Sequence, residues 1–172
     1  MKHETEQVIT VIQGDFAISD GPQVVLTTVL GSCIAVCLHD RNRRIGGMNH
    51  FLLAGGGDRS SSLRYGANAM ELLINGLLKR GSDRGSLEAK IFGGASILGN
   101  GRNIGASNAE FARDFLRDEA IPCLAESTGG SQARRIRFWP ADGRVRQLVV
   151  PDIPDERLPV AAVAPARDVE LF

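Results

Sequence analysis

Two apolar stretches joined by a short charged turn constrain the fold of this chain more than any other feature. The first stretch covers residues 34–38, the second covers residues 45–53, and residues 39–44 between them are polar or charged. Apolar runs of this length that end at such a turn are typical of paired β-strands. We therefore expect a hairpin here, with Cys33 entering its first strand and His50 inside its second.

A hairpin of this size brings the side chains of Cys33 and His50 face to face. A thiolate is a strong nucleophile, and an adjacent imidazole accepts the proton of the thiol. The pair is the minimum equipment for attack on an acyl carbon, which favours hydrolysis of an amide or an ester. Gly31 and Ser32 predict a bend just before Cys33, where backbone N–H groups face the reaction partner. Cys37 lies deeper in the strand and is expected to be inert packing.

The same residues also admit structural interpretations. Cys33 and Cys37 share one strand face, where free cysteine behaves as a small apolar residue, and a histidine in an apolar run is often satisfied in the core. A zinc site is a further alternative, because Cys33, Cys37, His39 and His50 have the spacing C-x3-C-x-H-x10-H. Structural zinc sites usually present a tight cysteine pair, which this spacing lacks. We expect no metal and no cofactor.

Length and charge narrow the class of protein. The 172 residues suit one domain, and 20 basic residues balance 20 acidic ones, so no net charge favours nucleic acid or an anionic membrane surface. The charged N-terminus lacks the apolar core of a signal peptide, and no run approaches the roughly 18 apolar residues that cross a bilayer. We expect a soluble, cytoplasmic protein with a single domain at 1–150. The proline-rich segment 151–172 is expected to be an extended or disordered tail.

The remaining patterns predict short strands and two helices, in a single α+β domain. Apolar residues recur at helical spacing over 65–78, and a capping-box pattern at 107–110 opens a second helix. Residues 55–62 are rich in glycine and serine and predict a mobile surface loop that follows His50. The Asp142-Gly143 pair predicts a hairpin turn. Further strands are expected at 8–12, 24–29, 87–92 and 123–125.

Four motifs resemble those of one known family, in the same order and at matching spacing. They are LGSCIAVCL at 30–38, GGMNHFLL at 46–53, EAKIFGGA at 88–95 and AESTGG at 125–130. The chain strongly resembles the CheD family, the chemoreceptor glutamine deamidases. This resemblance implies a layered α/β sandwich of mixed strands with two main helices, related to the catalytic domain of the cytotoxic necrotizing factor toxins.

The resemblance also implies a catalytic set of cysteine, histidine and threonine, which falls on Cys33, His50 and Thr27. Thr27 lies six residues before the cysteine and would hold the imidazole in place. The implied reaction is hydrolysis of glutamine side chains on methyl-accepting chemotaxis receptors, through a thioester, with release of ammonia. The same acyl chemistry admits a methylesterase side activity. The implied partners are the cytoplasmic helical region of the receptors and a CheC-like phosphatase.

Two other functions stay open on the sequence. One is an adaptor or binding module of the chemotaxis apparatus that docks a phosphatase-like partner, and the other is a cysteine deamidase that acts on a different protein. Rapid, selective alkylation of Cys33 would favour an enzyme, whereas three equally inert thiols would favour the module. The arginine-rich segment 134–137 is expected to be a solvated strand face or a contact to an acidic partner.

Overall fold

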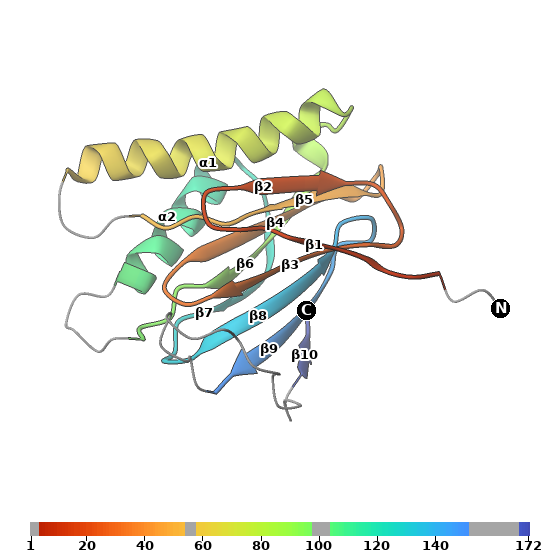
Figure 1. The fold of residues 1–172 in the computed structure, drawn as a ribbon. Coiled ribbons are helices and arrows are strands. Elements are labelled where there is room, and N and C mark those ends of the chain that lie inside the picture. The colour runs from red at the N-terminus through yellow and green to blue at the C-terminus, as the bar shows by residue number, and fades with distance from the viewer. Residues whose placement is uncertain (1–3, 54–57, 98–103, 152–168) are drawn as a thin grey trace.

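Two five-stranded sheets form the body of the molecule in the computed structural model, which describes residues 4–53, 58–97, 104–151 and 169–172 (Figure 1). Sheet A has the strand order β1-β3-β8-β9-β10, and sheet B has the order β2-β5-β4-β6-β7. The strands of sheet A, in that order, are Gln7–Thr10, Val24–Leu30, Ala133–Trp139, Arg144–Val150 and Val169–Leu171. Those of sheet B are Phe16–Ser19, Ile45–Asn49, Ile34–Asp40, Leu87–Gly93 and Cys123–Thr128.

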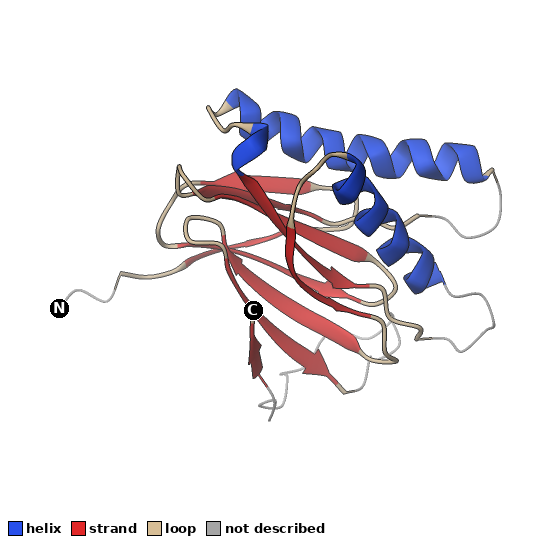
Figure 2. Cartoon of the chain, turned by 180° about the vertical axis from the view of Figure 1, so that it is seen from behind, coloured by secondary structure: helices blue, strands red, loops and turns tan. Residues whose placement is uncertain are grey.

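Two α-helices, α1 (Arg59–Lys79) and α2 (Ile104–Asp118), cover one face of sheet B, and sheet A covers the other face (Figure 2). A short 3₁₀ turn, Arg84–Ser86, precedes β6. The central strand β4 shows why this layering forms. Its residues alternate between the two faces of the sheet, as strand geometry requires. Ile34, Val36 and Leu38 pack on the helix side, whereas Ala35 and Cys37 pack between the sheets.

The layered α/β sandwich and the hairpin of β4 and β5 are therefore confirmed. The pairing of Cys37 with Met48 and of Asp40 with Ile45 fixes the antiparallel register. The expected turn at Asp142-Gly143 is confirmed as well, because β8 and β9 pair antiparallel on either side of it. None of the described helices combines the length and the apolar character that would let it span a membrane.

Both helices begin earlier than the sequence predicted. The side chain of Asp58 caps α1 by accepting from the Ser60 N–H at 3.0 Å, so residues 59–62 are helical and not part of a loop. The rest of that expected loop, at 55–57, lies outside the described residues. Helix α2 starts at Ile104, which places Ser107 inside the helix and makes the predicted cap wrong. The first turn of α2 packs closely against the backbone of residues 94–95, and the helix therefore begins before the capping-box pattern at 107–110.

The last four residues are docked, which corrects the expectation of an extended or disordered tail for this part of 151–172. Strand β10 pairs antiparallel with β9. The backbone of Phe172 exchanges two hydrogen bonds with Val145, at 2.8 and 3.0 Å. Its ring packs edge-on against Phe92, with centroids 5.5 Å apart. Proline-rich sequence carried no periodic signal, yet one terminal aromatic residue reaches the core between the sheets. Residues 152–168 of the segment lie outside the described residues.

Replacing Phe172 with alanine should lower the free energy of unfolding by about 1–2 kcal/mol, because a partly buried aromatic ring and its edge-on contact are lost. Urea denaturation followed by circular dichroism measures this change. Leu171→Ala is the matched control, since the Leu171 side chain is 66% exposed and its removal should change stability little. Equal stability of Phe172→Ala and the unmodified chain would contradict the docking.

Candidate active site

Cys33 stands directly before β4, and its backbone is fixed by the end of β6. Its carbonyl accepts the Gly94 N–H at 2.8 Å. Gly93 has φ +110°, and a Cβ atom there would lie 2.1 Å from the Cys33 carbonyl oxygen. Only glycine tolerates both that backbone conformation and that approach. The glycines of the 88–95 motif therefore set the position of the cysteine.

His50 stands directly after β5 and is buried. Its backbone is held by the segment between β1 and β2. The His50 N–H donates to the Asp15 carbonyl at 3.1 Å, and the Gly14 N–H donates to the His50 carbonyl at 2.7 Å. The histidine is thus locked to a loop at the edge of sheet B as well as to its own strand.

The register of the hairpin places Cys33 and His50 on one face. Ile34, the first residue of β4, and Phe51 exchange two backbone hydrogen bonds of 2.9 Å, which continue the β4–β5 pairing beyond the end of β5. In this register Cys33 and His50 are diagonal neighbours on the face toward sheet A. Diagonal neighbours on adjacent strands lie roughly 7–8 Å apart, within reach of long side chains. The structure therefore places the predicted pair on one face as diagonal neighbours, without a hydrogen bond from the thiol to Nε2.

The hydrogen bonds of the His50 ring identify its tautomer. Nδ1 lies 3.2 Å from the Val11 carbonyl oxygen and 2.9 Å from the Thr28 hydroxyl oxygen. A carbonyl oxygen only accepts, so Nδ1 carries the hydrogen and the lone pair of the neutral ring is on Nε2. Nε2 is buried and has no hydrogen-bond partner among the described residues. This arrangement leaves the basic nitrogen available to a proton donor.

Burial lowers the pKa of His50 from its ordinary value, because a charged ring is poorly solvated there. The hydrogen bond to the Val11 carbonyl favours the charged ring and offsets part of that decrease. The net decrease keeps the imidazole neutral at neutral pH. A neutral imidazole is the form that accepts a proton from a thiol.

Thr27 does not contact His50, and the hydrogen bond expected from it is made by Thr28. The Thr27 hydroxyl donates to the Ile136 carbonyl of β8 at 2.8 Å. Successive residues of a strand point to opposite faces, so Thr28 points between the sheets, toward the histidine, and Thr27 does not. A displacement of one residue along β3 therefore changes which threonine holds the ring.

Asn108 of α2 connects the segments that carry the cysteine and the histidine, although no motif in the sequence pointed to it. The side chain is fully buried. Its Nδ2 donates to the Ser32 carbonyl at 2.8 Å, and its Oδ1 accepts the Leu53 N–H at 3.0 Å. An asparagine on the buried face of a helix is the one signal that could have indicated it, because buried amides are almost always hydrogen-bonded.

Gln13 is a second residue that the sequence did not single out. It lies in the loop between β1 and β2, and its side chain is exposed. The Cys33 thiol donates to the Gln13 side-chain oxygen, with 3.3 Å between Sγ and Oε1. The site thus has a carboxamide against its nucleophile.

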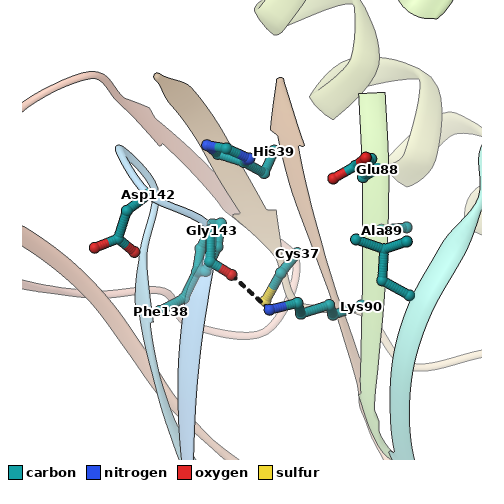
Figure 3. A pocket seen from close by; sticks show the side chains of 9 residues that line it. Cys37, His39, Glu88, Ala89, Lys90, Phe138, Asp142 and Gly143 are labelled. Carbon is teal, nitrogen blue, oxygen red and sulfur yellow. Dashed lines mark hydrogen bonds between the residues drawn. The ribbon is translucent and has the colours of Figure 1, made fainter. Parts of the chain in front are cut away.

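A pocket of about 100 Å³ lies elsewhere, near the Asp40 end of β4 (Figure 3). Cys37, His39 and Lys90 contribute to its walls, and the Lys90 ammonium donates to the Gly143 carbonyl at 2.8 Å. Burial raises the pKa of the Cys37 thiol far above its ordinary value, so this thiol is protonated and unreactive. Cys37 therefore gives this pocket no nucleophile.

The structural interpretation holds for Cys37, whose side chain is buried between the two sheets. Burial, together with the nearby Glu126 carboxylate, raises the pKa of the Cys123 thiol. The zinc interpretation required Cys33, Cys37, His39 and His50 to converge. Across the described ranges, no three histidine, cysteine, aspartate or glutamate side chains gather as metal ligands would.

The fold and the site together define a two-sheet α+β protein with a cysteine and a neutral histidine on one hairpin face. Residues 53–148 match the family model described as "CheD chemotactic sensory transduction". The chain belongs to the CheD family, as the motifs indicated.

Relatives support this membership over nearly the whole chain. A "Probable chemoreceptor glutamine deamidase CheD" of Caulobacter sp. (strain K31) is 58% identical over 173 residues, covering 95% of this chain and 92% of the relative. A protein of the same name from Agrobacterium fabrum is 48% identical, covering 95% and 96%. Among solved structures, Neisseria meningitidis protein NMB0706 is similar with a TM-score of 0.47 and 15% identity, covering 73% of this chain and 64% of that one.

We expect ¹⁵N NMR of the His50 ring to show a protonated Nδ1, an unprotonated Nε2 and a pKa below the ordinary 6.5. The unfolded chain then binds this proton more readily than the folded one. His50 should therefore cost no stability above pH 6.5 and should destabilise the fold progressively as the pH falls below it. The signals that disappear from the spectrum of His39→Gln belong to His39, which distinguishes them from those of His50. A protonated Nε2 in the neutral ring, or a pKa above 6.5, would contradict the tautomer.

Proposed function

We propose that this protein hydrolyses the side-chain amide of glutamine residues in chemotaxis receptors, giving glutamate and ammonia. The observation that carries the proposal is the neutral His50, with Nδ1 protonated and Nε2 without a partner among the described residues, on the same hairpin face as Cys33. The names of the relatives from Caulobacter and Agrobacterium support glutamine of a chemoreceptor as the substrate.

In the first half of the reaction, Cys33 Sγ attacks the amide carbon while its proton passes to His50 Nε2. The tetrahedral intermediate collapses when His50 returns that proton to the departing nitrogen, which leaves as ammonia. A thioester between Cys33 and the former glutamine side chain remains. Water then attacks the thioester with His50 as base, and the products are glutamate and the regenerated thiol.

Thr28 and Val11 have a positioning role in this scheme. Both place an oxygen against Nδ1, so they orient Nε2 toward the reacting proton and stabilise the imidazolium that forms transiently. Thr27 contributes to β3–β8 contact through its bond to Ile136. We therefore assign the imidazole-holding role, inferred from the family for Thr27, to Thr28.

A basic outer face of sheet A is the surface we propose for the receptor. Arg134 is not part of it, because this side chain is buried and donates to the Ser127 carbonyl at 2.5 Å. Strand alternation turns Arg135 and Arg137 outward, and Arg146 lies opposite Arg137 on β9. The Arg137 guanidinium is ion-paired with Glu6 at 2.5 Å, so Arg135 and Arg146 are the groups that would complement an acidic receptor helix.

Further parts of the proposal rest on chemistry or resemblance. A glutamyl methyl ester reacts through the same acyl intermediate, so the site would also act as a methylesterase. Docking of a CheC-like phosphatase and a cytoplasmic location stay predictions. If the protein were only an adaptor, catalysis would be dispensable. The hydrogen bonds and burial of His50 favour an enzyme over an adaptor.

Cys33→Ala should abolish ammonia release from a receptor cytoplasmic fragment, because the nucleophile is removed. Coupled detection of ammonia and the mass increase of about one dalton per converted glutamine measure the reaction. Cys37→Ala, in the strand that follows Cys33, is the matched control, and it should keep the activity while losing some stability, since only a buried packing group is removed. An active Cys33→Ala protein would overturn the proposed function.

Thr28→Val should lower kcat about 3- to 10-fold, the effect of one lost hydrogen bond worth about 1 kcal/mol. Thr27→Val is its neighbour-matched control and should stay within about 2-fold, because its hydroxyl contacts only the Ile136 carbonyl in the described geometry. The pH dependence of kcat distinguishes a positioning role of Thr28 from a loss of folded protein, because a misplaced imidazole changes the acidic limb of the pH profile. The opposite ranking of the two variants would restore the role to Thr27.

A further inference from the structure

The loop that carries Gln13 is attached to the catalytic histidine at three points. Val11 accepts from the His50 ring, Gly14 donates to the His50 carbonyl, and Asp15 accepts from the His50 N–H, at 3.2, 2.7 and 3.1 Å. Gly14 has φ +93°, which glycine adopts without strain. Gln13 therefore projects from a segment that cannot move independently of His50.

The Gln13 carboxamide meets the nucleophile directly. Cys33 Sγ and Gln13 Oε1 are 3.3 Å apart, and the thiol donates in this contact. A primary amide has an acceptor oxygen and a donor NH₂ group of nearly equal shape, which exchange places by a half-turn of the terminal torsion. The same side chain that accepts from a thiol therefore donates to a thiolate once the proton has moved to His50.

We propose that Gln13 is a further catalytic residue, whose side-chain NH₂ donates a hydrogen bond to the oxyanion that forms when Cys33 attacks the substrate. This inference rests on the proposed deamidase function. The oxyanion oxygen is bonded to the carbon that Sγ attacks, so it forms in the shell around Sγ that Gln13 occupies. Gln13 transfers no proton: it donates to the negative oxygen, while the proton passes between Cys33, His50 and the leaving nitrogen.

A competing interpretation treats Gln13 as an internal imitation of the substrate glutamine. Such a side chain would block the site and have to withdraw, or would itself be converted to glutamate. The three hydrogen bonds to His50 argue against withdrawal, because they fix the loop. The thiol hydrogen-bonds to the amide of Gln13, whereas a substrate glutamine would present its amide carbon to Sγ.

Steady-state kinetics of the full chain with a receptor cytoplasmic fragment test the inference. Gln13→Ala should lower kcat roughly 10²- to 10³-fold with little change in KM, the usual effect of removing one oxyanion donor. In Gln13→Met the side chain has a similar length but no hydrogen-bond donor, so this variant should show the same loss of kcat. Gln13→Glu should be at least as slow, because it places a negative charge beside the oxyanion. Gln7→Ala, an exposed glutamine at the start of β1, is the matched control and should keep full activity.

The outcomes separate the inference from the function. Should Cys33→Ala be inactive while both Gln13→Ala and Gln13→Met retain full kcat, the function stands and the role of Gln13 is wrong. Faster turnover in Gln13→Ala, or a mass increase of about one dalton at Gln13 in the unmodified chain, would show that Gln13 imitates the substrate. Either result would also overturn the proposed role of Gln13 as an oxyanion donor. Thermal unfolding shows whether each variant is folded. If Gln13→Ala is unfolded, the kcat of Gln13→Met decides whether Gln13 has the proposed role.

Discussion

The two backbone hydrogen bonds between Ile34, the first residue of β4, and Phe51 extend the β4–β5 ladder past the end of β5. Cys33 lies just outside this bridge and His50 lies just inside it, so the bridge sets the direction of both side chains. A slip of one residue in an antiparallel pair turns a side chain to the opposite face. The relation of thiol to imidazole therefore depends on this register, and Asn108 and Gly93 reinforce it from α2 and β6.

Burial and hydrogen bonds determine the protonation state and the tautomer of the His50 imidazole. Removal from water keeps His50 neutral, and the two oxygen atoms at Nδ1 place the lone pair on Nε2, which no donor among the described residues reaches. The loop from Val11 to Asp15 supplies one of these oxygens and holds the backbone on both sides of the ring. It also carries Gln13 to the thiol. One short segment thus positions the base and approaches the nucleophile.

The sequence indicated the hairpin, both helices and the cysteine–histidine pair, because these follow from local periodicity and a short loop. It did not distinguish Thr28 from Thr27, since both are strand residues and only the pairing of β3 with β1 and β8 decides which faces His50. Gln13 acts through a contact between distant segments and leaves no local pattern, and the only signal for Asn108 was an asparagine on the buried face of a helix. The start of α2 and the docking of Phe172 were missed for the same reason, because tertiary packing overrode weak local signals.

The central claim is that His50 accepts the proton of the Cys33 thiol. Alkylation with iodoacetamide between pH 5 and 9, with each cysteine quantified by peptide mass spectrometry, tests it without any substrate. We expect Cys33 to react fastest of the three thiols, with a pH dependence that His50→Gln changes markedly, while Cys37 stays inert in both proteins. A Cys33 reaction profile that is the same with and without His50 would contradict the account.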